Sequence, residues 1–396
     1  MVNTGSSDPV QVVCGAPNAR AGMKGVFAPA GAYVPGIDLV LKAGNIRGQD
    51  SNGMLCSERE MMISDEHDGI IALDQDAPVG ESFAAWAGLD DPVIEIAITP
   101  NRADCLGVRG VARDLAAAGY GTLKPLDTSA HEGSFDSPVT WRLDLDGAEH
   151  LAPLITGIAF RGVTNGPCPD WMARRLNAIG QRPISALVDI TNYVMFDLGR
   201  PLHAYDIDKI HGSELIVRQA DGGEPFAALN EKTYEMEAGM ITIGDAEGVD
   251  DLAGVMGGER TGVSDCTTGM FLEIAVFDPI SVATTGRKLN LNSDARYRFE
   301  RGLDSESPVW AAGHIARMVT EICGGEASVP VTMGPGVDWK RSIFLGSGKV
   351  ESLTGMQIDT AEQQRILEAL GFTVTSADGG FDVAPPSWRG DIDGAA

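Results

Sequence analysis

The sequence lacks the patterns that mark membrane proteins, secreted proteins and zinc ribbons. No apolar run approaches the roughly 20 residues that a membrane helix requires, and no signal-peptide pattern opens the chain. The six cysteines are spread over the whole length without a CxxC pair, which argues against a zinc ribbon or a disulfide framework. GxSxG and HExxH are also absent, so an ordinary serine or zinc hydrolase is not supported. We therefore expect a soluble cytoplasmic protein with reduced thiols and no membrane partner.

Basic residues are scarce. Lys and Arg number 30 against 56 Asp and Glu, and the formal net charge is -26. Phosphate contacts need Lys and Arg, so this balance opposes sequence-blind binding of nucleic acid but leaves room for a local basic patch. Arg174, Arg175 and Arg182 cluster in one expected helix and its exit. They predict either such a patch or a solvated helix face.

The length of 396 residues exceeds one ordinary core and predicts roughly two to four domains. Short apolar runs between turn residues suggest a small barrel, with strands at residues 10–14, 25–29 and 39–41. A strand at 93–98 and a helix at 108–118 are expected next. Both ends of the chain resemble points inside a domain, so we expect a fragment of a longer protein.

The most informative segment spans residues 168–206. Helices are expected at 170–179, at 184–198 and, further on, at 306–322. In the second helix Thr191 and Asn192 project from or beside the apolar face. A buried amide or hydroxyl without a partner costs about 1–3 kcal/mol. These side chains therefore either bond locally, Thr191 to its own helix and Asn192 to a neighbouring loop, or line a pocket.

Capping residues predict where two helices begin and end. Pro169 suits the first helical position of the segment 170–179, and Gly180 suits its C-terminal cap. Thr360 and Gln363 predict a capping box for a later helix, which Gly371 ends.

Two ionisable side chains stand in unusual surroundings. His203 can be a general base, a hydrogen-bond anchor or a structural residue. Glu273 lies in an expected strand, on the same face as Phe271, Ala275 and Phe277. A carboxylate there must reach water or accept hydrogen bonds. It therefore either binds specific donors or is an edge-strand charge that blocks aggregation.

A glycine-rich string, AGVMGG, occupies residues 253–258. Its backbone can be approached closely, but it lacks the spacing of a phosphate-binding loop. A tight turn or a bulge is therefore favoured over a phosphate cradle.

Several strings occur in the order found in one enzyme family. They are VVCGAPN at 12–18, GMLCSE at 53–58, TPNRADC at 99–105, residues 171–206, AGVMGG with Leu272-Glu273, residues 293–304, and PSWRGDI at 386–392. Together they span essentially the whole chain, which resembles the bacterial beta subunit of phenylalanine–tRNA ligase.

The resemblance implies an α+β multidomain protein. Its expected parts are a tRNA-binding OB-fold without its first strands at 1–86, a connecting α/β domain at 87–145, a mixed α/β editing domain at 146–335, and the start of a winged-helix-like domain at 341–396. The family's beta subunit pairs with an alpha subunit into a heterotetramer. The alpha subunit holds the ATP-dependent aminoacylation site. This chain would then contribute tRNA(Phe) binding, subunit assembly and hydrolytic editing of mischarged Tyr-tRNA(Phe).

The resemblance also implies roles for individual residues. Glu273 would read the tyrosine hydroxyl and His203 would orient the ester end or the attacking water, so both are predicted to be catalytic. The residues predicted to line the tyrosine or phenylalanine moiety are Arg182, Thr191, Asn192, Ala253, Gly254, Ser293 and Ala295, with threonine often standing in the family where Ser293 stands here.

A magnesium ligand is implied near the end of the chain. Asp391 matches the first of the carboxylates that bind Mg²⁺ in the family. The other ligands would follow the last residue, so an intact magnesium site is not expected here.

A second interpretation stays open, in which the chain is a non-catalytic tRNA-binding and assembly module with an inactive editing pocket. A free-standing small-molecule hydrolase is disfavoured, because the sequence contains no recognised nucleophile.

Overall fold

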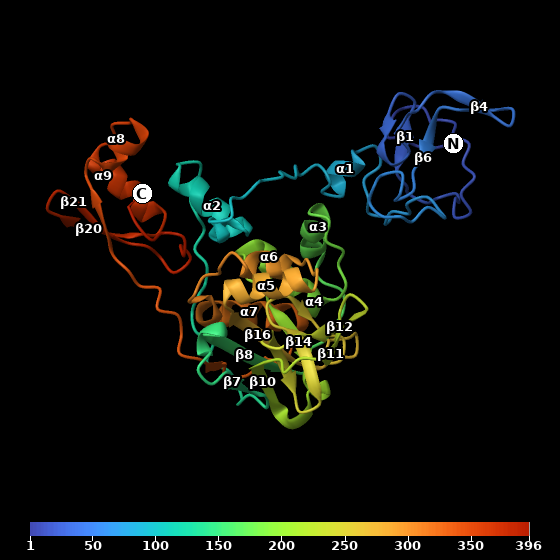
Figure 1. The fold of residues 1–396 in the computed structure, drawn as a ribbon. Coiled ribbons are helices and arrows are strands. Elements are labelled where there is room, and N and C mark those ends of the chain that lie inside the picture. Colours follow the sequence, from blue (N-terminus) through green and yellow to red (C-terminus); the bar gives the residue numbers. More distant parts are fainter. Residues whose placement is uncertain (396) are drawn as a thin grey trace. The chain divides into compact units, whose positions relative to one another are not determined.

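A computed structural model describes residues 1–395 and divides the chain into two compact units, Met1–Ile94 and Glu95–Ala396 (Figure 1). Each unit combines helices with several small sheets, so the predicted mixture of α and β structure is confirmed. The assignment of an OB-fold, a connecting domain and a winged-helix-like domain, with their boundaries, stays a prediction.

The first unit holds three two-stranded pairings, β1 with β6, β2 with β3 and β4 with β5. Its elements are β1 (Phe27–Pro29), β2 (Tyr33–Val34), β3 (Leu39–Val40), β4 (Gly44–Ile46), β5 (Gln49–Ser51), β6 (Gly53–Leu55) and α1 (Phe83–Trp86). The strands expected at 25–29 and 39–41 are therefore present in part. They surround a small core of Val26, Ala28, Val34, Leu41 and Cys56.

The prediction of a strand at residues 10–14 is wrong. Only Val10 pairs, in an isolated bridge to Val2. The backbone N–H of Val13 donates to the Ser51 hydroxyl at 3.1 Å instead of to a neighbouring strand. An apolar run forms a strand only if a second strand takes its backbone hydrogen bonds, and here a side chain takes one of them.

The second unit contains two larger sheets. Their orders are β17-β8-β16-β9, with β18 also paired to β8, and β15-β14-β13-β10-β7. The strands are β7 (Thr140–Asp144), β8 (Leu154–Arg161), β9 (His203–Asp206), β10 (Glu214–Gln219), β13 (Ile241–Asp245), β14 (Gly248–Leu252), β15 (Met256–Gly257), β16 (Gly269–Val276), β17 (Glu326–Ala327) and β18 (Val331–Met333), and a separate hairpin joins β11 (Glu224–Ala228) to β12 (Lys232–Met236).

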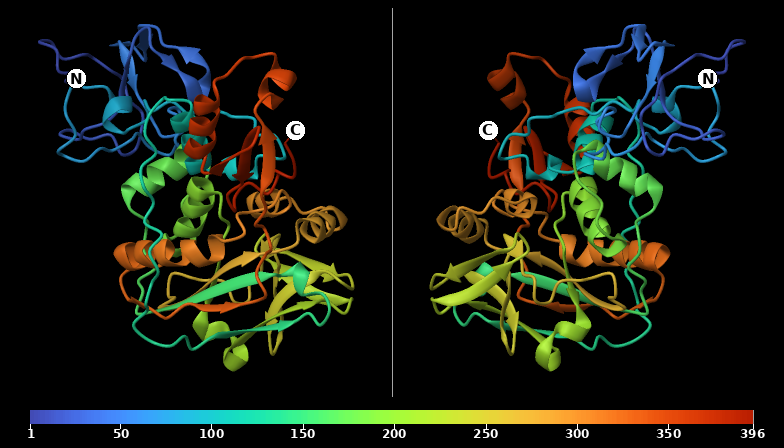
Figure 2. Two further views of the ribbon diagram at one scale, coloured as in Figure 1. Left: turned by 90° about the vertical axis from the view of Figure 1, so that its left-hand side faces the viewer. Right: turned by 90° about the vertical axis from the view of Figure 1, so that its right-hand side faces the viewer.

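Strand β16 is buried on both faces, and its side chains alternate between two cores. Phe271 and Ala275 point into a core shared with Trp141 of the facing sheet. Leu272 and Ile274 point into a core shared with helices α3 (Asp170–Ala178), α4 (Ala186–Leu198) and α7 (Ser307–Cys323). Figure 2 shows these helices on one side of the strands. The order in space is therefore helices, first sheet, second sheet.

The remaining helices are α2 (Val108–Ala117), α5 (Pro279–Lys288), α6 (Asp294–Phe299), α8 (Lys349–Thr354) and α9 (Thr360–Ala369). The predicted helices at 108–118, 170–179, 184–198 and 306–322 are confirmed to within about two residues, the usual uncertainty of helix ends. No helix in the described part of the chain combines the length and the apolar composition needed to cross a membrane.

Three local predictions are wrong. Pro169 is the residue before the first helical position of α3, not the first position itself. Asp359 precedes α9 and the Gln363 amide donates to the carbonyl of Ile358, so no capping box forms with Thr360. The segment 93–98 is not a strand, because it lies exposed and no neighbouring strand pairs with it.

The C-terminal part forms a three-stranded antiparallel sheet in the order β19-β21-β20. Its strands are β19 (Ile343–Gly346), β20 (Thr373–Ala377) and β21 (Gly380–Ala384). Phe372, Phe381 and Val383 form its core, against which Leu367 of α9 packs.

Gly157 in β8 is predicted to be essential for packing between the two sheets. A Cβ atom at this position would lie 2.1 Å from Cζ of Phe271 and 2.6 Å from Nε1 of Trp141. Two rings in a filled core cannot move aside cheaply, so Gly157→Ala should lower the stability by about 1–3 kcal/mol. Thermal unfolding followed by circular dichroism measures this. Gly166→Ala is the control, because a Cβ there meets nothing within 4 Å; an equal effect of both changes would contradict the prediction.

Candidate functional site

A cavity of about 420 Å³ opens between the two sheets of the second unit. Its walls come from α4, β9, β14, β15, β16 and the start of α6. Such a volume falls in the range of small-molecule pockets, which are usually apolar with a few placed polar groups.

The cavity brings together most of the residues that the sequence singled out. Seven of them line it, namely Thr191, Asn192, His203, Gly254, Glu273, Ser293 and Ala295. Arg182 and Ala253 do not. Arg182 is exposed while its neighbour Gln181 lines the cavity, and Ala253 is buried behind the wall.

Helix α4 supplies one wall. Its first N–H groups are satisfied from outside the helix, because Ala186 donates to the carbonyl of Gly166 at 2.7 Å and Leu187 to the Asn165 side chain at 3.0 Å. Thr191 donates to the carbonyl of Val188 at 2.7 Å. This local bond was one of the two predicted alternatives, yet the residue lines the cavity as well. The two alternatives are compatible.

Glu273 lies near the middle of β16, which is paired with β8 on one side and β9 on the other. The edge-strand interpretation of this carboxylate is therefore wrong. The residue is only 5% exposed, and the Tyr205 hydroxyl donates to its Oε2 at 3.1 Å. Burial raises the pKa of Glu273 to about 7, while the Tyr205 hydrogen bond and the charge of Arg200 oppose that rise.

His203 stands directly opposite Glu273 in the pairing of β9 with β16. Its ring meets that of Tyr205 edge to face, with centroids 4.5 Å apart. Its Nε2 is buried and has no hydrogen-bond partner within residues 1–395. Burial lowers the pKa of His203 to about 4, so the imidazole is neutral at pH 7.

Gly257 makes room for this imidazole. A Cβ atom at position 257 would lie 2.1 Å from Cε1 of His203, so only glycine lets β15 pass so close to the ring. The predicted tight turn just before it is confirmed, because Val255 donates to the carbonyl of Leu252 at 2.8 Å and Gly254 adopts a φ of +70°.

Asp251 is a member of the site that the sequence analysis missed. It lies on β14, is 4% exposed, and lines the cavity with its Oδ2 at 3.7 Å from Nε2 of His203. The only signal in the sequence was the pair Asp250-Asp251, because consecutive residues in a strand point to opposite faces and a strand with one covered face would bury one of the two. Its neighbour Asp250 is held elsewhere by Arg260 at 2.5 Å and Thr261 at 3.2 Å.

Ser293 connects the start of α6 to the glycine-rich turn. Its hydroxyl accepts from the backbone N–H of Arg296 at 3.0 Å as an N-cap and donates to the carbonyl of Val255 at 2.6 Å. One side chain thus holds together two segments of the cavity wall.

Asp391 lies apart from this cavity. Arg389 donates to both oxygens of its carboxylate, at 2.8 and 3.0 Å, and Asn101 donates at 3.1 Å. Burial would raise the pKa of Asp391, but the hydrogen bonds and charge of Arg389 outweigh it and the pKa is lowered. In this arrangement both oxygens are already engaged and do not fit a metal ion. The role of Asp391 as a magnesium ligand stays a prediction.

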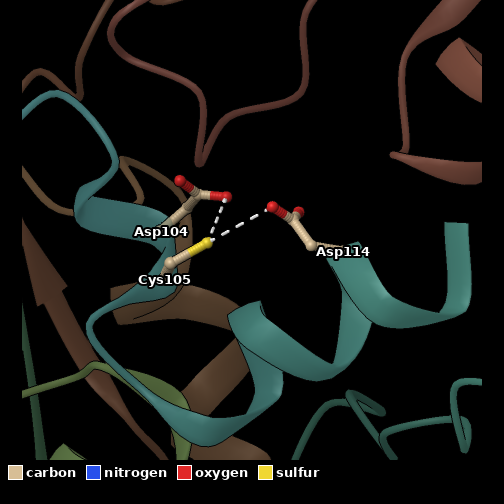
Figure 3. Close-up of side chains that lie close together, drawn as sticks. All are labelled: Asp104, Cys105 and Asp114. Carbon is tan, nitrogen blue, oxygen red and sulfur yellow. Dashed lines mark hydrogen bonds between the residues drawn. The ribbon is translucent and has the colours of Figure 1, made fainter. Parts of the chain in front are cut away.

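A second cluster has the composition of a metal site. Asp104, Cys105 and Asp114 each point a ligand atom toward the others within 4.8 Å (Figure 3). However, Nη2 of Arg102 donates to Cys105 at 3.0 Å and to Asp114 at 2.8 Å, and Nε donates to Asp104 at 2.9 Å. The guanidinium takes the place of a cation, so these residues do not form a metal site.

Comparison with protein families identifies three domains in this chain. Residues 1–82 match a putative tRNA binding domain, residues 151–324 match the B3/4 domain, and residues 343–396 match the tRNA synthetase B5 domain. The cavity belongs to the B3/4 region. These matches define the chain as part of a tRNA synthetase.

Similar curated proteins narrow this class to one family. The chain is 53% identical over 390 residues to the phenylalanine–tRNA ligase beta subunit of Cereibacter sphaeroides, which covers 98% of this chain and 48% of that protein. It is 51% identical over 398 residues to the beta subunit of Brucella abortus, covering 100% of this chain and 49% of that protein. The chain belongs to the family of phenylalanine–tRNA ligase beta subunits. It spans about half the length of the relatives it matches.

A solved N-terminal fragment of the phenylalanyl-tRNA synthetase beta subunit from Pyrococcus horikoshii is a more distant match. It is 17% identical, with a TM-score of 0.38, and the match covers 79% of this chain and 91% of that fragment. A likeness of this size carries no argument about the site.

The raised pKa of Glu273 predicts how stability depends on pH. The folded protein holds this proton below about pH 7, whereas the unfolded chain holds it only below about pH 4.5. The contribution of Glu273 to the free energy of unfolding is therefore complete below pH 4.5 and is lost as the pH rises through 7. Glu273→Gln removes the dependence and should be more stable than wild type by up to about 3 kcal/mol at pH 8 and equal to it near pH 4.5.

Urea unfolding at several pH values measures the difference. Glu235→Gln, a change of the same charge on the exposed part of β12, serves as the control. A Glu273→Gln curve parallel to wild type at every pH would refute the assignment of this proton.

Proposed function

We propose that this chain supplies the tRNA-binding and editing parts of a phenylalanine–tRNA ligase, and that the cavity hydrolyses mischarged Tyr-tRNA(Phe). The observation that supports the proposal most directly is the buried carboxylate of Glu273 on the wall of a small-molecule cavity. A buried acceptor of this kind favours a ligand with a hydroxyl over the same ligand without it.

The need for such a site follows from binding energetics. An aminoacylation site built for phenylalanine rejects tyrosine, which differs by one hydroxyl, by only about 10²-fold. A second site that hydrogen-bonds the phenol discriminates the other way by roughly 10⁴ or more, because phenylalanine leaves its polar groups unpaired. Glu273 would be the group that reads the phenol.

The chemical step would take place beside His203. Its neutral imidazole and unpartnered Nε2 suit a residue that positions the ester end or the attacking water. Thr191, Asn192, Gly254, Ser293 and Ala295 would form the walls around the amino-acid side chain. Arg182 and Ala253 would act from outside the lining, Arg182 from the exposed loop that carries Gln181.

The rest of the enzyme is part of the proposal. Residues 1–82, which match a putative tRNA binding domain, would bind tRNA(Phe) through an OB-fold, and residues 341–396 would begin a winged-helix-like domain. Aminoacylation with ATP would occur on a partner alpha subunit in a cytoplasmic heterotetramer. Asp391 would contribute a ligand to Mg²⁺ only in an arrangement that frees its carboxylate from Arg389 and Asn101.

The alternative, an assembly module with an inactive pocket, is less well supported. An inactive pocket would have no use for a buried carboxylate, an unpartnered imidazole and a glycine that makes room for it. Calorimetric titration with free tyrosine and phenylalanine separates the two, because only an editing pocket prefers tyrosine.

Deacylation of Tyr-tRNA(Phe) tests the proposal. Glu273→Ala and His203→Ala, introduced into the complete enzyme, should each slow hydrolysis at least tenfold, since losing one hydrogen bond to a charged group costs about 1.5–3 kcal/mol. Aminoacylation with phenylalanine should be unchanged. Glu235→Ala, an exposed carboxylate on β12, is the matched control. Full editing activity in both site variants would rule out the assignment.

A further inference from the structure

Two buried carboxyl groups, not one, face the cavity from opposite sheets. Glu273 comes from β16 of the first sheet and Asp251 from β14 of the second. Both are at most 5% exposed. The Tyr205 hydroxyl donates to Glu273 at 3.1 Å, and hydrogen bonding by the same hydroxyl lowers the pKa of Asp251.

One hydrogen-bond donor is missing from the set formed by Glu273, Asp251 and Tyr205. A tyrosine hydroxyl has a single proton and satisfies one carboxylate at a time. Arg200 lies close enough for its charge to act on Glu273, but its hydrogen bonds go to the Ser307 hydroxyl at 2.8 Å, to the carbonyl of Pro201 at 3.2 Å and to the carbonyl of Ala275, not to either carboxyl group. While Tyr205 donates to Glu273, the Asp251 carboxyl group therefore has no other hydrogen-bond donor among residues 1–395.

The other groups around the pair do not supply that donor. His203 on β9 stands 3.7 Å from Asp251, beyond hydrogen-bond reach. Asp250 on β14 adds negative charge and raises the pKa of Asp251, and Asp294 at the start of α6 lines the same cavity. Strand β15 and helix α4 contribute no charged group to the lining.

Resting on the function proposed above, we propose that Asp251 is a second specificity-determining carboxyl of the pocket, and that the phenolic hydroxyl of a bound tyrosyl group is the donor the set lacks. The phenol donates to one carboxyl while Tyr205 donates to the other. Phenylalanine brings no donor and leaves one buried carboxylate unpaired. The discrimination between tyrosine and phenylalanine is thereby set by Glu273, Asp251 and Tyr205 together, not by Glu273 alone.

This arrangement makes the preference for tyrosine depend on pH. When one carboxyl of the pair is protonated, one buried negative charge fewer needs a donor, so phenylalanine is penalised less. Burial raises the pKa of both groups, Glu273 to about 7. The preference for tyrosine should therefore grow as the pH rises through this region.

The midpoint is the pH at which the preference for tyrosine is halfway between its low-pH and high-pH values. Two variants should move this midpoint in opposite directions. Asp251→Asn removes a repelling charge and supplies N–H donors of its own, so the midpoint should fall below that of wild type and the tyrosine preference at pH 8 should drop at least tenfold. Tyr205→Phe removes the hydrogen bond that lowers the pKa of both carboxyls, so the midpoint should rise. A purely structural role of Asp251 would not shift the midpoint.

The measurement is calorimetric titration of the full chain with L-tyrosine and with L-phenylalanine from pH 5 to pH 9. Asp250→Asn is the matched control, because this neighbouring buried aspartate faces Arg260 and Thr261 instead of the cavity. Loss of its charge should lower the midpoint, since that charge raises the pKa of Asp251, but the preference for tyrosine at pH 8 should be kept. A preference and midpoint unchanged in Asp251→Asn would overturn the inference, as would an equal loss in Asp250→Asn.

If circular dichroism shows that Asp251→Asn does not fold, Tyr205→Phe decides. A raised midpoint in that variant supports the carboxyl pair, and an unchanged or lowered one overturns it. The proposed function fails separately, namely if the wild-type chain shows no preference for tyrosine at any pH.

Discussion

The burial of one carboxylate in a central strand governs the architecture around the cavity. Glu273 cannot reach bulk water from the middle of β16, so the fold must surround it with compensating groups. Tyr205 is held against it by β9, and Arg200 contributes positive charge from the turn that leads into that strand. The space left open beside these groups is the cavity. The pocket thus lies where apolar side chains do not fill the space beside a buried carboxylate.

The sequence predicted best where structure is local. The helices α4 and α7 and the strand β16 were visible in their apolar periodicity, and the odd setting of Glu273 was visible as a charge among apolar neighbours. Residues 10–14 and 93–98 had the same apolar character but form no strand, because no second strand lies beside them. Strand formation is a property of a pair, and a single run does not reveal its partner.

The site was predictable in part for the same reason. Seven of the residues singled out by the family resemblance line one cavity, whereas Arg182 and Ala253 do not. A matched position tells where a residue stands in the chain but not which way its side chain faces. Asp251 and Tyr205 escaped notice because their importance arises only when two sheets face each other. Gly257 likewise matters only through the ring of His203 that packs against it.

The cluster around Arg102 keeps the thiol of Cys105 protonated, through burial and the neighbouring carboxylates. Burial, followed by the charge of Asp104, raises the pKa of Cys105 to about 12 although Arg102 opposes the rise. The thiolate is the species that reacts with oxidants and alkylating agents. Because Cys105 stays protonated at neutral pH, its thiol is a poor nucleophile, and an arginine, unlike a bound metal, cannot be lost to a chelator.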